Sequence, residues 1–586
     1  MARRFPLLAE LKRRNVLRSG ALYIGVTWAL AQGISQLDQA LGLPTWAPRA
    51  FLIACAVGFP FWIAFGWFYE LTPAGFKRDD AAAAIDAPTR QSNARKLDFA
   101  IIGVLIVIVV LLASGYFLRG APVPNASAAF DPPADSIVVL PFTNLDNDPQ
   151  QRYFSNGITE ELTDALGQTT GLTVIAWDTA SKYAGSKQTP REIGRGLNVA
   201  HVLAGSIQRA GGVVRVTSEL IDTTDGRQLW SQHYDDSLQN IFAVQDKISA
   251  AIADALKVKF AGMQAAPTLN PRAHELYLKG IAALKGVTAA DAQAAQAYFG
   301  QALQLDPRYA DAWAGLSASY LALSQWSNLP VAEATAKMRA AAQKALALDP
   351  HNVYALIELG NADNSDNHTA AAETFYQKAI KLDPNNARAH LDYGTLLPIS
   401  QAIAQTLEAA RLDPDNATVQ NNLATLYQDM GNWPKTIAAA QALNKLAPRS
   451  TDPAFYLAFA YSQMRRGADA VHAFDLVHPA TAADRQLVAA GRLTYRALLD
   501  PSLHAQALEA LAALRHATSN PYANGDLLQL YLALGENAIA LEMLPAICAA
   551  GPVGCNDLAF NPLYTALHGD PQFVKLAKQY TTETLQ

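Results

Sequence analysis

The sequence predicts a multi-domain protein with an N-terminal three-helix membrane anchor, an α/β domain and an all-α repeat solenoid. Three observations predict this order. Residues 99–118 form an uncharged apolar run, residues 135–262 alternate strand-like and helix-like patterns, and Asp-Pro pairs recur after residue 300. A chain of 586 residues is long enough to hold several such domains.

The membrane anchor is predicted over residues 1–118. The run 99–118 has 20 residues without a charge, and as a helix it would span roughly 30 Å, the thickness of a bilayer's hydrocarbon core. Residues 19–37 and 50–69 are two further uncharged runs, and whether the first of them crosses the bilayer fully stays open. Because no small-x-small cleavage site ends the first run, a retained span is favoured over a cleaved signal peptide.

Charge predicts the orientation of this anchor. Residues 1–98 hold 12 Lys/Arg and 7 Asp/Glu, which gives a net charge of +5. Since the whole chain has a net charge of −5, the residues after 98 carry a net charge of −10. The basic N-terminus and the basic loop 70–98 are expected in the cytoplasm, and three crossings then place the rest of the chain on the other side. An acidic soluble part also argues against nucleic acid as its main partner.

An α/β domain is predicted over residues 135–262, after a Pro- and Ala-rich linker at 119–134. Short apolar runs predict strands at 136–142, 172–176, 201–207, 213–221 and 227–234, and helical spacing predicts helices at 155–166, 190–197 and 240–260. The chain contains no CxxC, HExxH, GxSxG or GxxxxGK[ST] motif. We therefore expect no enzymatic activity, no catalytic residues, no cofactor and no metal site.

Several motifs of this region resemble a known domain family. The runs SIVVLPFTNL, YFSNGITEEL, REIGRGLNVAHVLAGSI, LIDTTDGRQLWSQHYD and IFAVQDKI resemble the TolB N-terminal-like, or FlgO-like, domain. Asn156 and Ala204 stand where that family has acidic residues. The resemblance implies a non-catalytic, protein-binding domain in the envelope of a Gram-negative bacterium, so the membrane would be the inner membrane and the exported part periplasmic.

A helical repeat array is predicted over residues 272–482. The pairs Asp306-Pro307, Asp349-Pro350, Asp383-Pro384, Asp413-Pro414 and Ala447-Pro448 follow one another at 43, 34, 30 and 34 residues. A period near 34 is typical of tetratricopeptide repeats, whose helix pairs stack because one pair cannot bury its own apolar face. Residues 483–586 are expected to be degenerate helical repeats with a C-terminal cap.

Repeat spacing predicts which side chains face the concave surface of the solenoid. The candidate partner groove contains polar, amide-bearing and aromatic residues: Tyr354, Ile357, Asn361, Arg388, Leu391, Asn421, Thr425, Phe455 and Phe459. Ordinary solvated helix faces are the alternative for any one of them. Cys548 and Cys555 either form a disulfide, favoured by an oxidising compartment, or remain a reduced pair.

These features predict a membrane-anchored periplasmic scaffold in envelope assembly or maintenance. Its partners would be envelope proteins or peptides and inner-membrane lipid, and a homo-oligomer stays open. The alternative is a signal-transducing membrane regulator that senses periplasmic conditions through the same domains. The partner's identity, the stimulus and the oligomeric state do not follow from the sequence.

Overall fold

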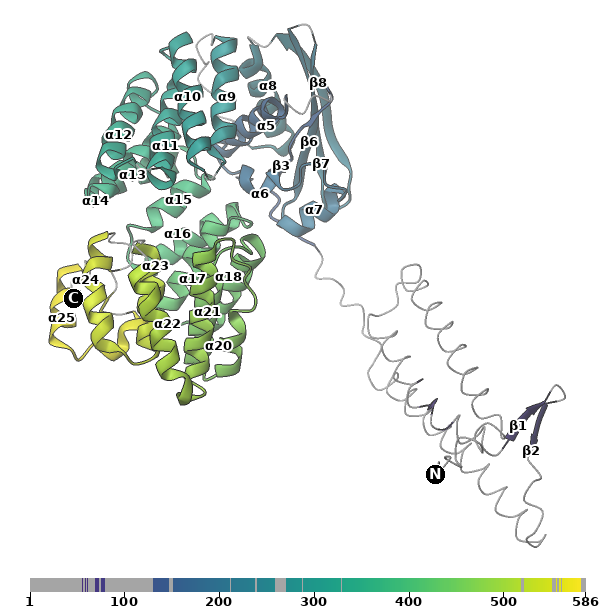
Figure 1. Cartoon of the computed structure of the whole chain (residues 1–586). Coiled ribbons are helices and arrows are strands. Elements are labelled where there is room, and N and C mark those ends of the chain that lie inside the picture. Colours follow the sequence, from purple (N-terminus) through teal and green to yellow (C-terminus); the bar gives the residue numbers. More distant parts are fainter. Residues whose placement is uncertain are drawn as a thin grey trace. The chain divides into compact units, whose positions relative to one another are not determined.

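The structure is a computed structural model of the chain. It describes residues 130–146, 151–210, 212–237, 240–258, 270–286, 288–327, 329–517, 521–550, 555, 558–559 and 561–580, with residues 55, 58, 59, 61, 69–72 and 75–78 nearer the N-terminus. The chain divides into two compact units, Met1–Ala126 and Ser127–Gln586 (Figure 1).

The described part of the first unit contains an antiparallel hairpin of β1 (Tyr69–Thr72) and β2 (Gly75–Arg78). The predicted spans 19–37 and 99–118 lie outside the described residues, as does most of 50–69. Within the described residues, none of the helices combines the length and the apolar character that a membrane crossing requires.

The second unit begins with a mixed α/β layer. Its sheet has the order β5-β3-β6-β7-β8, with β4 paired to β6, and the strands are β3 (Ser136–Val139), β4 (Thr143–Asn144), β5 (Thr173–Val174), β6 (His201–Ala210), β7 (Val213–Asp222) and β8 (Gln228–Ser237). The strand β3 is parallel to β5 and β6, whereas β6, β7 and β8 are antiparallel. The predicted order of strands and helices is found, with two short elements that were not predicted, β4 and the helix α6 (Trp177–Ser181).

Four helices cover the two faces of this sheet: α5 (Arg152–Gly167), α6 (Trp177–Ser181), α7 (Pro190–Leu197) and α8 (Ile241–Leu256). Apolar residues of α5 and α8 pack on one face, and α6 and α7 cover the other beside Val138 and Val202. The start of α7 is set by a capping box between Thr189 and Glu192, because each side chain satisfies a free backbone N–H of the first turn.

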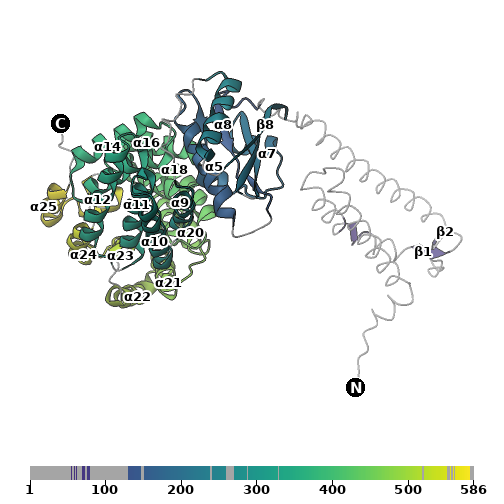
Figure 2. The same cartoon turned by 90° about the horizontal axis from the view of Figure 1, so that it is seen from above.

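Helix pairs follow the α/β layer, and they confirm the predicted repeat solenoid (Figure 2). Each helix packs on the next, and most first helices of successive pairs also contact one another. The helices are α9 (Pro271–Leu284), α10 (Ala289–Leu305), α11 (Ala310–Trp326), α12 (Val331–Leu348), α13 (Val353–Ser365), α14 (Thr369–Leu382), α15 (Ala387–Gly394), α16 (Ile399–Leu412), α17 (Ala417–Asp429), α18 (Trp433–Leu446), α19 (Asp452–Gln463), α20 (Gly467–Ala473), α21 (Ala482–Ala497), α22 (His504–Ala517), α23 (Pro521–Ala533) and α24 (Asn537–Ala550).

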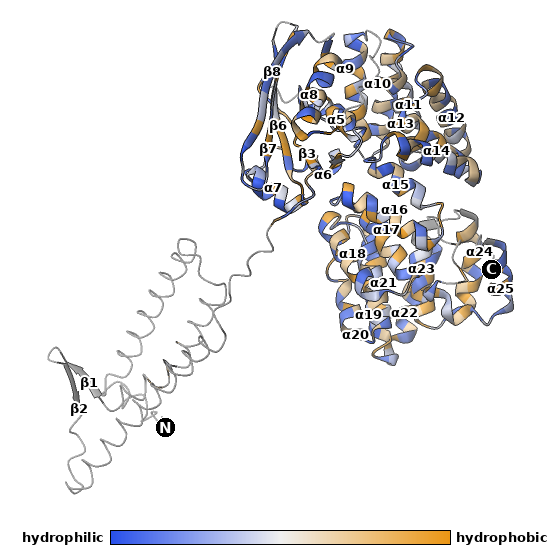
Figure 3. Cartoon of the chain, turned by 180° about the vertical axis from the view of Figure 1, so that it is seen from behind, coloured by the Kyte–Doolittle hydropathy of each residue, from blue (hydrophilic) through white to orange (hydrophobic). Residues whose placement is uncertain are grey.

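Small residues allow the helices of this array to approach closely. A Cβ on Gly280 or on Gly315 would lie 2.5 Å from the Phe299 ring, and one on Gly360 would lie 2.5 Å from Tyr376. Both rings are fully buried. Hydrophilic and hydrophobic residues alternate along the ribbons, as expected for helices that bury one side (Figure 3).

The chain closes with a short 3₁₀ segment, η5 (Pro562–Leu567), and α25 (Pro571–Tyr580). Leu558, Tyr564 and Phe573 belong to the same core cluster as Phe455 and residues of α21, α23 and α24. The C-terminal segment is therefore part of the solenoid's core.

The α/β layer and the first helix pairs share one hydrophobic core. A single cluster joins Ile137, Leu162 and Leu203 to Tyr277 and Phe299. In Figure 1 the helices α5 and α8 lie between the sheet and α9, and α5 contacts α9 directly. The boundary predicted between residues 262 and 272 thus separates two sequence patterns within one compact unit.

Candidate functional site

A cleft of about 370 Å³ lies where the α/β layer faces the first helices of the solenoid. Its lining comes from α5, the β5–α6 segment, α13, α15, α17 and the turns before α15 and α17. Polar and charged residues of the lining are Glu160, Thr163, Asp164, Asp178, Lys285, Tyr354, Asp383, Asn385, Asn386, Arg388, Asp392, Asp413, Asn416 and Thr418. We call this site the acidic cleft.

One side of the acidic cleft is held together by Asn385, in the turn before α15. Its amide nitrogen donates to the carbonyl oxygens of Gly167 at 2.7 Å and Leu172 at 2.8 Å. Its amide oxygen accepts from the Val174 N–H at 3.1 Å. One solenoid side chain therefore satisfies three main-chain groups of the α/β layer.

The turn before α17 makes a second junction with the α/β layer. The Thr179 hydroxyl donates to Asp413 Oδ1 at 2.6 Å and accepts from the Asp415 N–H at 2.9 Å. The Ala176 N–H donates to the Leu412 carbonyl at 2.8 Å. Turns that separate consecutive repeats thus serve as docking points for the domain that precedes the repeats.

Carboxylates dominate the electrostatics of the acidic cleft. Burial raises the pKa of Asp164 well above its usual range, and the nearby charges of Glu160 and Asp383 raise it further. Burial also raises the pKa of Asp383 to about 6, although hydrogen bonds from Asn386 and Asn385 oppose the rise. Tyr354 donates its hydroxyl to Asp164 Oδ2 at 2.8 Å.

Two cations face these carboxylates. Lys285 Nζ donates to Glu160 Oε1 at 2.9 Å and lies 3.7 Å from Asp178 Oδ1. Arg388 lies 2.7 Å from buried Glu358 and 3.5 Å from Asp392. The lining thus holds six acidic side chains and two cations, an excess of acidic groups even where burial raises their pKa values.

The most strongly perturbed histidine lies elsewhere, inside the packing of α5 against α9. His274 is 1% exposed, and its Nδ1 lies 2.9 Å from the Tyr309 hydroxyl. Burial lowers the pKa of His274 to about 3, so its ring is neutral at physiological pH. Its enclosure between the two domains indicates a structural role.

Three of the nine groove residues predicted from repeat spacing line the acidic cleft: Tyr354, Arg388 and Leu391. Asn361 lies beside it, and its side-chain oxygen accepts from the Tyr376 hydroxyl at 2.6 Å. Asn421 and Thr425 are half-buried on α17, where Thr425 pairs with the Tyr456 hydroxyl at 2.7 Å.

The remaining three predicted groove residues are core residues, which corrects their expected placement. Ile357 is fully buried, and Phe455 and Phe459 are 3% and 6% exposed. Ile357 packs with the second helix of its own pair, and Phe455 makes an edge-on contact with Phe474. The spacing rule identified the correct helices, but apolar side chains on those helices turn into the helix–helix contacts.

Sequence reasoning missed most of the charged residues of the acidic cleft. Glu160, Asp164 and Asp178 belong to the α/β layer, and Lys285 follows α9. Asp383 and Asp413 were noted only as markers of the repeat period. Their regular position at the turns was the available signal, because every such turn lies at the same edge of a solenoid.

Cys548 and Cys555 are joined by a disulfide bond in the structure. Both side chains are buried in the C-terminal core. No group of three or more His, Cys, Asp or Glu side chains among the described residues is arranged to hold a metal ion.

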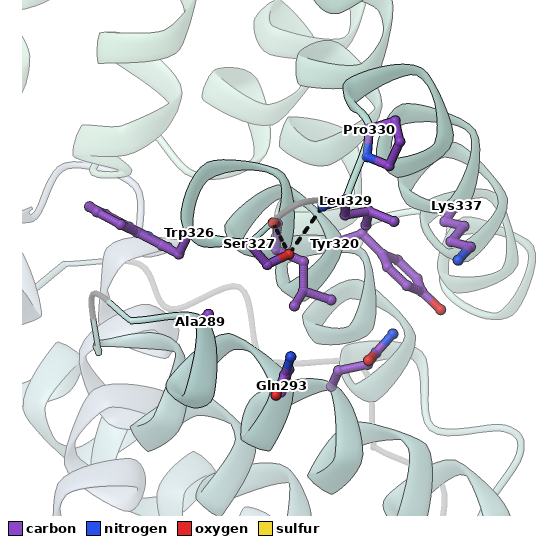
Figure 4. Close-up of a pocket in the computed structure, with 10 residues that line it drawn as sticks. Ala289, Gln293, Tyr320, Trp326, Ser327, Leu329, Pro330 and Lys337 are labelled. Carbon is purple, nitrogen blue, oxygen red and sulfur yellow. Dashed lines mark hydrogen bonds between the residues drawn. The ribbon is translucent and has the colours of Figure 1, made fainter. Parts of the chain in front are cut away.

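A second hollow of about 680 Å³ lies beside α10, α11 and the start of α12 (Figure 4). Trp326, Tyr320, Gln293 and Lys337 are among its lining residues, and Trp326 is 47% exposed. Lys337 is the one charged side chain of this lining, and it lies over the Tyr320 ring at 5.6 Å. The hollow therefore lacks a set of converging titratable groups.

Comparisons with known proteins give one relative by sequence and several by structure. No family model matches the chain. The chain is 36% identical over 220 residues to a Rhizobium meliloti (strain 1021) protein named "Putative adenylate cyclase 3". The match covers 36% of this chain, and the chain spans about 38% of that curated relative.

Solved structures similar to the chain include tetratricopeptide proteins. Pseudomonas aeruginosa pilF has 16% identity and a TM-score of 0.29, covering 35% of this chain and 89% of its own. A tetratricopeptide repeat protein from Parabacteroides merdae has 15% identity and a TM-score of 0.31, and the match covers 44% of this chain and 99% of that protein's chain. At these TM-scores the likenesses add nothing to the fold assignment, which follows from the helix contacts described above.

The relative from Rhizobium meliloti contradicts one expectation from the sequence. The absence of catalytic motifs led to the prediction that the chain is not an enzyme, yet the curated relative carries the name of one. The lack of short catalytic motifs was therefore not a sufficient ground for that prediction, because catalytic residues can be dispersed along a sequence.

Proposed function

We propose that this chain is a protein-binding scaffold whose partner inserts a segment into the acidic cleft. One observation carries the proposal: three side chains predicted from repeat spacing, Tyr354, Arg388 and Leu391, line a cleft with walls from two different domains. Its volume of about 370 Å³ is at the small end of ligand sites, roughly 300–1,000 Å³, so it suits side chains of a peptide rather than a folded domain.

The lining indicates the chemistry of this partner. Six carboxylates face two cations, so a segment with Lys or Arg side chains would relieve the excess negative charge. Leu391 and Val419 add an apolar wall beside the charged groups. A basic peptide with an adjoining apolar side chain fits this combination.

We place the scaffold at the inner membrane, with a cytoplasmic N-terminus, three spans and residues beyond 118 in the periplasm. The basic residues before residue 98 and the motifs similar to the TolB N-terminal-like domain support this placement. The disulfide between Cys548 and Cys555 adds support, because such bonds persist in oxidising compartments. At that location we propose that the scaffold acts in envelope assembly or maintenance.

The proposal is tested by photo-crosslinking from the full chain in its native membranes. A photo-reactive residue replaces Thr418, an exposed residue at the rim of the acidic cleft, or Thr374, another exposed residue on α14. We expect a discrete protein adduct from position 418 that is absent at 374 and weakened by Asp392→Asn. Equal adducts from both positions, or none from 418, would contradict the scaffold.

Localisation is tested separately with a topology reporter fused after Gln586. A periplasmic signal supports the proposed orientation. A cytoplasmic signal refutes the periplasmic placement while leaving the crosslinking result interpretable, because the acidic cleft lies wholly within residues 127–586.

The second candidate is a signal-transducing regulator linked to cyclic nucleotide formation. The relative named as an adenylate cyclase is the observation that favours it. Purified full chain incubated with ATP and a divalent cation should then form cyclic AMP, or should alter the rate of a separate cyclase. If it does neither, this candidate is excluded.

A further inference from the structure

The second half of the solenoid carries exposed apolar side chains at one repeated position. Met430, Met464 and Leu498 are the C-terminal caps of α17, α19 and α21, and they follow one another at steps of 34 residues. They are 51%, 40% and 45% exposed, and the neighbouring Leu499 is 58% exposed. We call Met430, Met464, Leu498 and Leu499 the apolar ridge.

The apolar ridge is continuous from one repeat to the next. A Cβ on Gly467 would lie 2.6 Å from Leu499 Cδ2, so the Leu499 side chain rests against the α19–α20 turn that follows Met464. First helices α17 and α19, and α19 and α21, also contact each other. Equivalent caps of stacked helices therefore form a row along one edge of the solenoid.

That edge lies at the far end of the helices from the docked α/β layer. The α/β layer binds the turns that precede α15 and α17, whereas Met430 follows the last residue of α17. A 13-residue helix is roughly 20 Å long. The apolar ridge is thus separate from the acidic cleft.

Cationic side chains flank the apolar ridge. Within the part of the chain that the structure describes, no ion pair joins Lys435, Arg465 or Arg496 to a carboxylate. Lys435 lies over the Tyr427 ring at 5.1 Å. Of the neighbouring charges, Arg466 is neutralised by Asp469 at 2.7 Å. The carboxylate of Asp500 accepts from Ser502, and the charge of Arg496 also lowers the pKa of Asp500, so the charge of Arg496 is partly compensated.

Arg465 is held in a backbone conformation that disfavours it. Its φ of 58° lies in the left-handed region, where the corresponding turns of other pairs have Gly431 at 66°, Gly535 at 81° and Asn367 at 59°. Side chains with a bulky Cβ substituent are strained there. The Arg465 side chain therefore adds a cation at the turn between α19 and α20, where other pairs have glycine or asparagine.

We propose that the apolar ridge and its three cations bind the surface of a bilayer that contains anionic phospholipids. Flexible Met and Leu side chains at projecting helix ends can enter the boundary between headgroups and acyl chains, while Lys and Arg remain at the headgroups. The four apolar side chains are 40–58% exposed, so they can enter such a boundary. The proposal is independent of the acidic cleft and of the predicted spans.

The test uses residues 127–586, which form one compact unit with all described core clusters inside it. Co-sedimentation measures binding to vesicles of phosphatidylglycerol and phosphatidylethanolamine, with phosphatidylcholine vesicles as the comparison. We expect binding to the anionic vesicles alone, weakened by added salt, and at least tenfold weaker for the double variant Met464→Gln, Leu499→Gln. The control variant Leu305→Gln, Leu348→Gln changes residues of similar exposure, 42% and 43%, at the C-terminal ends of the second helices α10 and α12. Because second helices run antiparallel to first helices, these residues lie at the other edge of the solenoid, and the control should bind within twofold of the parent.

The variant Arg465→Gly separates lipid binding from folding. Because glycine adopts the left-handed conformation without strain, this variant should have a higher melting temperature. It should nevertheless bind anionic vesicles about fivefold more weakly, which is the contribution of one cation to affinity for such a surface. Unchanged vesicle binding in this variant, or equal losses in the Leu305/Leu348 control, would overturn the proposal.

A photo-reactive residue at position 464 or 348 of the full chain in native membranes gives a second readout. We expect lipid adducts from 464 and none from 348. Adducts to protein alone from 464 would mean that an acidic protein segment occupies the ridge, and the bilayer proposal would be wrong.

Discussion

The two halves of the solenoid's inner face are covered by the chain itself in different ways. The first half receives the α/β layer, joined through Asn385, through Asp413 and through carboxylates with raised pKa values. The second half receives the C-terminal segment, whose Leu558, Tyr564 and Phe573 enter an apolar core closed by a disulfide. One junction is largely polar at its rim. The other is mainly apolar, with one hydrogen bond from Asn561 to Asp429 and a disulfide between α24 and the segment that follows it.

This difference indicates which junction can respond to conditions. Apolar burial and a covalent bond are nearly independent of pH, whereas buried carboxylates couple a contact to protonation. The acidic cleft lies at the polar junction. A change of protonation at the polar junction would alter the walls of the acidic cleft while leaving the C-terminal half folded.

The largest effect is expected from removing a core ring in each half. Phe299→Ala and Phe474→Ala should each lower the free energy of unfolding by about 3–5 kcal/mol, because both rings are fully buried between helices. Hydrogen exchange of β3 distinguishes them. Exchange there should rise in Phe299→Ala alone, since only Phe299 shares a cluster with the sheet. Equal protection of β3 in both variants would show that the α/β layer folds independently.

The disulfide gives the next largest effect. Its cysteines are 7 residues apart, and opening so short a loop should cost about 2–3 kcal/mol. In the variant Cys548→Ala, Cys555→Ala, we expect faster hydrogen exchange in η5 and α24 and no change in β5. A loss of protection at β5 would mean that the two junctions are coupled.

Asn385→Ala should weaken the polar junction by about 1–2 kcal/mol, because three main-chain groups of the α/β layer lose their partner. Limited proteolysis near residues 167–174 should become faster. Asn432→Ala is the matched control: it removes an N-cap of α18 far from the α/β layer in sequence and in contacts. Identical proteolysis in the two variants would argue against a junction held by Asn385.

The smallest effect is a pH dependence of the same junction. Since the pKa of Asp383 is about 6 in the folded chain, the folded state binds more protons than the unfolded state between about pH 4 and 6. The junction should therefore tighten as pH falls, by about 1 kcal/mol between pH 7.5 and 5.5. Exchange rates of β5, corrected for the intrinsic pH effect, measure this, and Asp383→Asn should reduce the difference. A junction that loosens towards pH 5.5 would reverse the assigned sign.

Much of the fold could be predicted from residue patterns, and the placement of site residues only in part. The apolar runs that became β3 and β6 were predicted because short buried strands are locally encoded. Repeat spacing correctly placed Tyr354, Arg388 and Leu391 at a groove, since all three line the acidic cleft. It misplaced Ile357, Phe455 and Phe459, because spacing identifies a helix face only approximately and packing decides which side chains enter the core.

By itself, the sequence determined the order of the α/β layer and the helix pairs, since hydrophobic periodicity and Asp-Pro punctuation act over a few residues at a time. Only the tertiary structure decided that Asn385 and Thr179, more than 200 residues apart, belong to one junction, and that Glu160 and Asp164 share a cleft with Arg388. The physical reason is that such contacts depend on how a whole domain docks on a curved array. No local pattern of residues encodes that docking.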